Sequence, residues 1–230
     1  MKYLILLILL IGSVSFSKTK QINIVVLDTG LNLEDNRFKN HLCKEGHKDF
    51  TKEGLDDIDS HGTHIVGNII KYAKQSNYCL VIVKYYSKHL SPKENFNNYF
   101  SALRYSVNLS NINIINISGG GTGFNLYEYD LIKNHENILF VVAAGNNGKN
   151  YDETTERYYP AMCLLSNIIP VGSLDRDNKR LKSSNYGSII KRWELGKNVL
   201  STCPVDNCYM TGNSISASIA TGKIIRNQTK

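Results

Sequence analysis

Four short runs rich in Val and Ile constrain the fold of this chain more than any other feature. They are INIVVL, CLVIVK, INIINI and ILFVV, at residues 22–27, 79–84, 112–117 and 138–142. Their apolar residues do not alternate strictly with polar ones, which is typical of strands buried on both faces of a parallel sheet. The run IIPVGSL at residues 168–174 is predicted to be a fifth strand of this kind.

Stretches that can form helices separate these runs. Apolar side chains at helical spacing follow Pro92 on one face: Phe96, Tyr99, Phe100, Leu103 and Val107. Helices are predicted at residues 62–74, 93–107 and 124–135, with a last one from near Ser214. Alternating strands and helices predict an α/β protein with a doubly wound, mostly parallel sheet and helices on both faces. Turns and short strands are predicted at residues 175–211.

The N-terminal 17 residues have the pattern of a secretory signal peptide. Lys2 precedes an unbroken apolar run at residues 4–11, and Ser15 and Ser17 supply small residues before the predicted cut. The alternative is a membrane anchor, but the run is shorter than the ~20 residues that span a bilayer. We therefore expect a signal peptide at residues 1–17, one domain at residues 18–230, and a secreted, periplasmic or extracellular protein with no membrane contact after cleavage.

The charge pattern argues against nucleic-acid binding. The formal net charge is +7, but the basic residues are spread singly along the chain. A nucleic-acid site is expected to gather Lys and Arg into a block with interleaved aromatic residues. No nucleic-acid partner is therefore predicted.

All five cysteines lie beyond the predicted signal peptide. Export permits disulfides, and Cys203 and Cys208, which bracket a four-residue turn, are the first candidate pair. Cys43 and Cys79 are the second, and the odd number leaves at least one thiol unpaired. The cysteines and histidines show no zinc-finger spacing, so no structural metal is predicted.

Three polar residues are predicted at the edge of the sheet where sites form: Asp28, His61 and Ser214. Asp28 follows the first predicted strand, and His61 and Ser214 begin predicted helices. Sites in open α/β sheets form at the carboxyl ends of the strands. In these roles an imidazole takes the proton of the Ser hydroxyl and a carboxylate orients the imidazole. Asn146 follows another strand and can donate a hydrogen bond to a developing oxyanion, beside the N–H groups at the start of a helix.

Other interpretations of these residues remain open. Asp28 belongs to a DTG triplet, but an aspartic protease needs two carboxylates that share a proton, and the chain has one such triplet. His61 and His64 have the spacing of two metal ligands, although no third ligand motif is visible. Asp28 and Asn146 can also be ordinary turn residues, and Ser214 an ordinary helix-start residue.

Six segments resemble the successive signature blocks of subtilisin-like serine proteases, the subtilase family: VVLDTG, DSHGTHIVG, NISGGG, VVAAGNNG, YYPA and GNSISAS. The resemblance runs from about residue 22 to residue 222. It implies a subtilisin-like peptidase domain and, together with the predicted signal peptide, an exported serine endopeptidase. It also implies that Asp28, His61 and Ser214 form a catalytic triad, and that Asn146 and the Ser214 backbone N–H form the oxyanion hole.

The same resemblance implies how a substrate binds. Ser118, Gly119 and Gly120 would pair with an extended peptide or an unfolded protein, with main-chain hydrogen bonds supplying affinity. Tyr158, which precedes the Tyr-Pro of YYPA, would line the floor of the pocket for the side chain before the scissile bond. A phenol ring there would favour small or medium apolar residues.

Departures from the family pattern keep a second function open. The nucleophile block commonly ends in Pro, where this chain has Ser218, and the chain ends at Lys230, so the domain is expected to be C-terminally short. The calcium-binding loop that many relatives insert after the first helix is missing, so neither a metal nor a cofactor is predicted. The alternative is a catalytically weak or inactive subtilase-like peptide-binding protein. An α/β-hydrolase is disfavoured because its Ser precedes its Asp and His.

Overall fold

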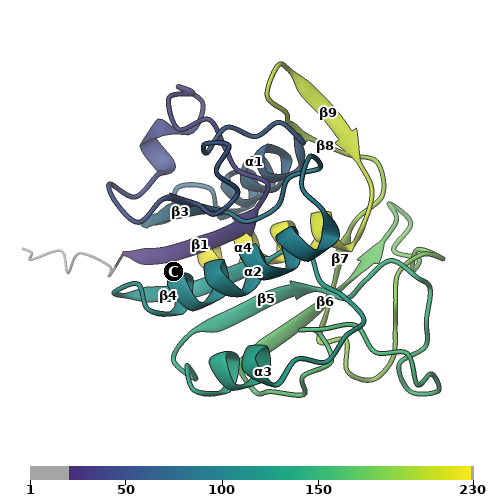
Figure 1. Ribbon diagram of the computed structural model, residues 1–230. Coiled ribbons are helices and arrows are strands. Elements are labelled where there is room, and N and C mark those ends of the chain that lie inside the picture. Colours follow the sequence, from purple (N-terminus) through teal and green to yellow (C-terminus); the bar gives the residue numbers. More distant parts are fainter. Residues whose placement is uncertain (1–20, 229–230) are drawn as a thin grey trace, which may run out of the picture.

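A computed structural model describes residues 21–228, so the predicted signal peptide lies outside the described residues. Seven parallel strands form one sheet in the order β2-β3-β1-β4-β5-β6-β7 (Figure 1). They are β1 (Ile22–Asp28), β2 (Lys48–Asp49), β3 (Tyr78–Lys84), β4 (Ile112–Ile117), β5 (Leu139–Ala143), β6 (Ile168–Leu174) and β7 (Arg192–Leu195). A separate antiparallel hairpin is formed by β8 (Val199–Thr202) and β9 (Asn207–Met210).

Helices cover both faces of the sheet, which confirms the predicted doubly wound arrangement. They are α1 (His61–Ala73), α2 (Pro92–Val107), α3 (Leu126–Lys133) and α4 (Asn213–Gln228), with a short 3-10 helix, η1, at Lys39–His41. Helices α1 and α4 share one core layer, and α2 and α3 share the other (Figure 1). In β1, Ile24 and Val26 enter the first layer, whereas Val25 and Leu27 enter the second. Burial on both faces explains why the Val/Ile runs lack strict alternation.

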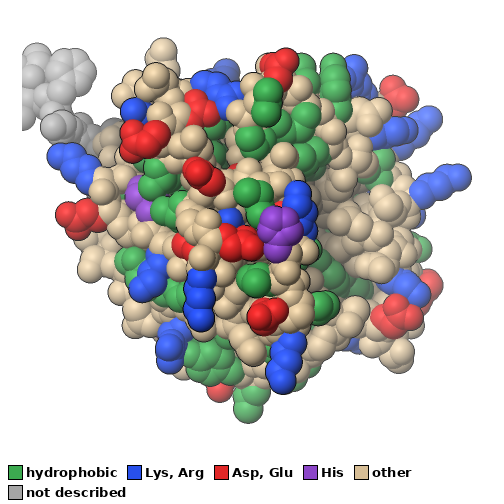
Figure 2. Space-filling model, turned by 45° about the horizontal axis from the view of Figure 1, so that its top comes forward, with side chains coloured by type: hydrophobic (Ala, Val, Ile, Leu, Met, Phe, Trp, Pro, Cys, Tyr) green, Lys and Arg blue, Asp and Glu red, His purple; other side chains and the backbone are tan. Residues whose placement is uncertain are grey.

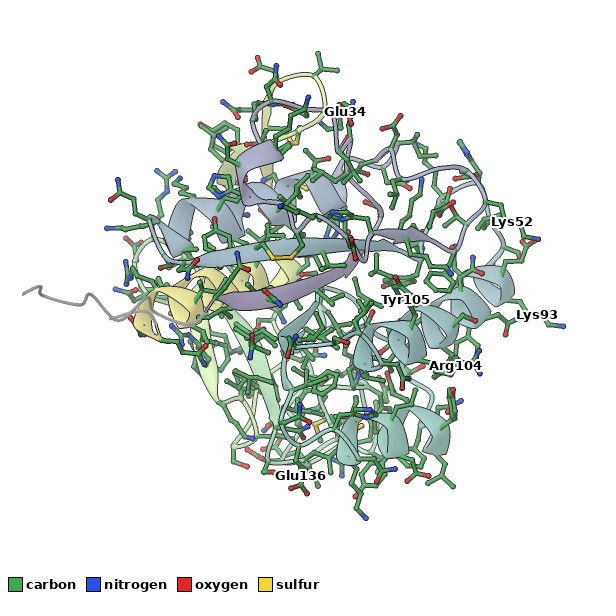
Figure 3. All side chains as sticks on the ribbon, turned by 90° about the vertical axis from the view of Figure 1, so that its left-hand side faces the viewer. Glu34, Lys52, Lys93, Arg104, Tyr105 and Glu136 are labelled. Atoms are coloured by element: carbon green, nitrogen blue, oxygen red, sulfur yellow. A yellow bond between two sulfur atoms is a disulfide. The ribbon has the colours of Figure 1, made fainter. Side chains whose placement is uncertain are left out.

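The start of α2 shows how local sequence sets an element. Ser91 and Glu94 form a capping box, and Pro92 occupies the first turn, where no backbone N–H is needed. Lys93 and Arg104 project outward from the helix (Figure 3). Phe96 lies on the predicted apolar face but is 52% exposed, and its ring packs edge-on against Phe100 of the same helix.

One predicted helix differs from the structure in extent, and one short strand was not predicted. Helix α3 is shorter than the predicted 124–135, because Asn125 accepts a hydrogen bond from the Glu128 N–H and so caps the helix. The segment 175–211 contains three short strands, β7, β8 and β9, in agreement with the predicted turns and short strands. The strand β2, only two residues long, was not predicted because it is too short to show a pattern.

Both candidate disulfides are confirmed. Cys43 is bonded to Cys79, and Cys203 to Cys208, whereas Cys163 is a buried free thiol. Acidic and basic side chains are interspersed over the face shown in Figure 2. Within residues 21–228, no helix is both long enough and apolar enough to cross a membrane.

Candidate active site

Asp28 and His61 meet at the carboxyl edge of the sheet. Asp28 ends β1 and is 5% exposed, and His61 is the first residue of α1. Nδ1 of His61 lies 2.7 Å from Oδ1 of Asp28, and that oxygen also accepts the Thr29 N–H at 2.8 Å. A carboxylate accepting the Nδ1–H leaves Nε2 unprotonated in the neutral ring, and this nitrogen can then act as a base.

The electrostatics around His61 favour its protonated form. Burial by itself lowers the pKa of His61, but the charge and hydrogen bond of Asp28 oppose this, together with the charges of Asp57 and Asp59. The carboxylates outweigh the burial, so the pKa of His61 is raised above its ordinary value of 6.5. An imidazolium formed during a reaction is therefore stabilised at this position.

Ser214 is the second residue of α4 and is half-buried. The Ser118 hydroxyl donates to the backbone carbonyl of Ser214 at 3.2 Å, which ties the end of β4 to the first turn of α4. A hydrogen bond joins His61 to Asp28, whereas within residues 21–228 none joins the Ser214 hydroxyl to His61. Such bonds often tighten only when substrate is bound.

Asn146 faces the same space as the Ser214 hydroxyl. A Cβ built on Gly212 would lie 3.5 Å from Oγ of Ser214 and 3.6 Å from Nδ2 of Asn146, so the bare glycine leaves this space open. The Asn213 N–H donates to Oδ1 of Asn146 at 2.9 Å. With its oxygen so occupied, the Asn146 amide has its NH₂ group left to donate.

Asn213 is a residue that the sequence analysis missed. Its side chain donates to the Gly145 carbonyl at 2.5 Å and bonds the buried Ser173 hydroxyl, so the first residue of α4 is fixed to the segment after β5 and to β6. Its position next to Ser214 was the available signal, but Asn is common in turns and its partners are remote in sequence.

Ser118, Gly119 and Gly120 follow β4 directly. A Cβ on Gly120 would lie 2.4 Å from the Tyr159 carbonyl oxygen, so this position needs glycine, and one on Gly119 would lie 2.6 Å from the Tyr85 hydroxyl oxygen, which would have to move. Within residues 21–228, the backbone N–H and C=O groups of Gly119 and Gly120 have no hydrogen-bond partner. They are free to pair with an added strand.

The ring of Tyr158 lies between two glycine-containing segments. A Cβ on Gly120 would meet ring atom Cε1 of Tyr158 at 2.5 Å, and one on Gly145 would meet Cγ at 2.9 Å. The ring is half-buried, and burial raises the pKa of Tyr158 to about 12. The phenol is therefore neutral at ordinary pH and fills the space between residues 118–120 and residue 145.

The second histidine of the HGTH segment is fully buried. Nε2 of His64 lies 3.0 Å from the Val199 carbonyl oxygen, and Nδ1 lies 3.2 Å from Nδ2 of Asn68. Both ring nitrogens are thus engaged inside the protein, and burial lowers the pKa of His64. In the part of the chain that the structure describes, no group of three or more His, Cys, Asp or Glu residues is placed to hold a metal ion.

Asp57 is the other site residue that the sequence analysis missed. Its buried carboxylate bonds the Thr29 hydroxyl at 2.8 Å and the Thr63 N–H at 2.7 Å. The available sequence signal was an Asp four residues before a His that starts a predicted helix. The structure adds that Ser60 gives α1 no side-chain cap.

Comparison with known proteins shows which family the chain resembles. The model of the Subtilase family matches residues 19–227. The chain is 30% identical over 224 residues to the major intracellular serine protease of Bacillus subtilis (strain 168), covering 90% of this chain and 68% of that protein. It is 28% identical to subtilisin-like protease 2 of Arthroderma otae, covering 84% of this chain but 44% of that protein.

Solved structures agree on the fold. The crystal structure of a cold adapted subtilisin-like serine proteinase superimposes with a TM-score of 0.72 at 24% identity, covering 87% of this chain and 72% of that one. The likeness shows that the chain has the fold of this proteinase.

Proposed function

The chain belongs to the subtilase family of serine proteases, and we propose that it is an exported endopeptidase that cleaves peptide bonds through Asp28, His61 and Ser214. The observation that carries the proposal is the 2.7 Å contact between Nδ1 of His61 and Oδ1 of Asp28. This contact leaves Nε2 of His61 as the base for a serine on the neighbouring helix.

The proposed reaction has two stages. Nε2 of His61 takes the proton of the Ser214 hydroxyl as Oγ attacks the peptide carbonyl carbon. Asp28 stabilises the imidazolium, which then gives its proton to the departing amine. In the second stage His61 activates water in the same way, water attacks the acyl-enzyme, and Ser214 regains its proton.

The negative oxygen of each tetrahedral intermediate needs donors already in place. The Asn146 NH₂ group and the Ser214 backbone N–H are proposed for this role, because Nδ2 of Asn146 and Oγ of Ser214 border the same space at Gly212. Donors fixed before the reaction do not have to reorganise during it. The bond from the Asn213 N–H to Asn146 supplies that fixation.

The substrate is proposed to be an extended peptide or an unfolded protein. Its backbone would pair with the free N–H and C=O groups of Gly119 and Gly120, next to Ser118. Because the ring of Tyr158 fills the adjoining space, the side chain before the cut is expected to be small or medium-sized and apolar.

Export is the proposed route because the fold carries disulfides. The structure contains the disulfides Cys43–Cys79 and Cys203–Cys208. Disulfides persist in oxidising compartments and are rare in reducing ones. A secreted or periplasmic location accounts for both. The alternative function, a weak or inactive peptide-binding protein, is favoured by the missing bond between the Ser214 hydroxyl and His61 among the described residues.

The test separates these two functions. The purified protein and its Ser214→Ala variant are treated with a serine-directed fluorophosphonate and incubated with casein. We expect the unmodified chain to be labelled and to degrade casein, and the variant to do neither. A correctly folded wild-type protein that is neither labelled nor active would contradict the proposed endopeptidase function.

A further inference from the structure

Asp57 anchors more groups than any other carboxylate near the candidate site. Oδ1 accepts the Thr29 hydroxyl at 2.8 Å, the Asp59 N–H at 3.1 Å and the Ser60 N–H at 2.9 Å. Oδ2 accepts the Thr63 N–H at 2.7 Å and the Thr63 hydroxyl at 2.6 Å. The side chain is buried, and within residues 21–228 it forms no salt bridge. Donors alone therefore offset the cost of burying its charge.

These bonds link the segment that carries Asp28 to the segment that carries His61. Thr29 follows Asp28 directly, and its N–H donates to the Asp28 carboxylate. The Thr29 hydroxyl donates to Asp57 and accepts the Gly62 N–H at 2.8 Å. His61 thus lies between two residues, Ser60 and Gly62, whose N–H groups are held by Asp57 and Thr29.

The backbone before His61 needs this support. Ser60 has φ of +69°, a left-handed conformation that is unfavourable for a non-glycine residue. Ser60 gives α1 no side-chain cap, so the first-turn N–H groups of Gly62 and Thr63 are bonded by Thr29 and Asp57 instead. Asp57 therefore fixes both the start of α1 and the direction in which the His61 ring leaves it.

We infer that Asp57 is a positioning residue that, acting through Thr29, holds the His61 ring against Asp28. The inference rests on the proposed endopeptidase function for its kinetic consequence, but not for its structural one. His61 takes the proton of Ser214 as the transition state forms, so a displaced ring is expected to reduce kcat while KM changes little.

The decisive substitution is Asp57→Asn. Each Asp57 oxygen faces at least one backbone N–H, so either orientation of an amide would place its NH₂ group against a donor. We expect kcat to fall on the order of 10- to 100-fold with little change in KM. Thr29→Val, which deletes the linking hydroxyl, should reproduce the loss, whereas Thr29→Ser should restore near-normal turnover.

Asp49→Asn is the matched control. Asp49 accepts the Thr51 N–H at 2.7 Å, the Thr51 hydroxyl at 2.6 Å and the Gly54 N–H at 3.0 Å, in a similar local pattern. It bonds neither Thr29 nor the first turn of α1. The same change of charge and of local bonding should therefore leave kcat near the wild-type value.

A spectroscopic measurement tests the geometry without relying on turnover. In the Ser214→Ala background, which prevents self-cleavage, the Nδ1 proton of His61 bonded to Asp28 should give a far-downfield proton NMR signal. We expect Asp57→Asn and Thr29→Val to shift or broaden this signal, and Asp49→Asn to leave it unchanged.

Two outcomes would overturn the inference. One is an Asp57→Asn protein with wild-type kcat and an unshifted proton signal. The other is an Asp49→Asn protein whose kcat falls, or whose proton signal shifts, as much as in Asp57→Asn. If Asp57→Asn does not fold, Thr29→Val decides in its place. If the wild-type protein hydrolyses no peptide, the proposed function fails, and the proton signal alone decides whether Asp57 positions His61.

Discussion

At the scale of single residues, the oxyanion donor makes the sharpest prediction. Asn146→Leu keeps the size of the side chain but deletes the NH₂ donor. Loss of one such donor in subtilisin lowers kcat about 10²–10³-fold, or about 3–4 kcal/mol, and we expect the same range here. KM should change little, because the donor acts on charge that develops in the transition state.

The neighbouring residue supplies the control for this substitution. Asn147 is also exposed, and its backbone N–H, not its side chain, bonds Asn185. Asn147→Leu should therefore leave both constants near wild type in steady-state kinetics with a peptide ester. A change confined to KM in the Asn146 variant would indicate ordinary substrate binding instead.

The raised pKa of His61 predicts the pH profile. Neutral His61 is the base, so kcat/KM should fall as the pH drops through the pKa of the free enzyme's histidine. Because that pKa is raised, the midpoint of the acid limb should lie above 6.5. Asp59→Asn removes one of the charges that raise it, so the limb should move to lower pH.

Asp175→Asn is the control for the pH profile. Asp175 accepts backbone N–H groups from Asp177 and Lys179 in a surface turn and is not among the groups that shift His61. Its substitution should leave the limb in place. A wild-type limb below 6.5, or one that Asp59→Asn does not move, would contradict the proposed role of the charges around His61.

Tyr158 makes a prediction about specificity. If its ring fills the floor of the substrate pocket, Tyr158→Gly should shift preference toward Phe and Tyr before the cut in a peptide-library profile. Tyr158→Phe keeps the ring and should keep the wild-type preference. A wild-type profile that already favours Phe or Tyr and does not change in the glycine variant would exclude this pocket.

At the scale of elements, the strands were predictable and the loops that orient the site were not. The runs at β1, β3, β4, β5 and β6 show burial on both faces, a property that each strand carries in its own sequence. The positions of Asp28 at a strand end and His61 at a helix start could also be predicted, because each follows from the local sequence of its element. The left-handed turn at Ser60 could not, because it depends on Asp57 and Thr29, whose partners are known only once the chain is folded.

The crossing of α1 and α4 is set by a glycine. A Cβ on Gly222 would lie 2.6 Å from the Ile69 carbonyl oxygen and 3.1 Å from the Ala73 nitrogen. Alanine favours a helix over glycine by about 1 kcal/mol, but a clash with backbone cannot be relieved by rotating a side chain. We therefore expect Gly222→Ala to destabilise the protein by about 1–3 kcal/mol.

Thermal unfolding measures this effect. For a domain of this size, each kcal/mol lowers Tm by about 2–4 °C. Gly123→Ala, where the added Cβ meets nothing within 4 Å, should leave Tm nearly unchanged. A Gly222→Ala protein as stable as wild type would show that the two helices can separate without cost.

At the scale of the whole molecule, the two disulfides should contribute unequally to stability. Cys43 and Cys79 are separated by 36 residues, and Cys203 and Cys208 by 5. On the chain-entropy account, the first should stabilise by about 4 kcal/mol and the second by about 2 kcal/mol. The double substitution of Cys43 and Cys79 by Ser should therefore lower Tm more than that of Cys203 and Cys208.

Reductant provides the complementary measurement. Dithiothreitol should lower the Tm of the wild-type protein but not that of a variant with all four bonded cysteines replaced, because Cys163 has no disulfide to lose. A wild-type Tm that does not respond to reductant would contradict the expected contribution of the two disulfides to stability.

The contact between α1 and α4 also determines when, during synthesis and folding, the candidate site can form. Among the described residues, His61 lies on the first long helix and Ser214 on the last, so a chain still being synthesised cannot form the candidate site until residue 214 has left the ribosome. Pairings between segments so remote in sequence form slowly and only after the intervening chain has collapsed. A copy whose synthesis stops before α4 therefore lacks the candidate site, and the proposed activity can arise only once α4 has packed against α1.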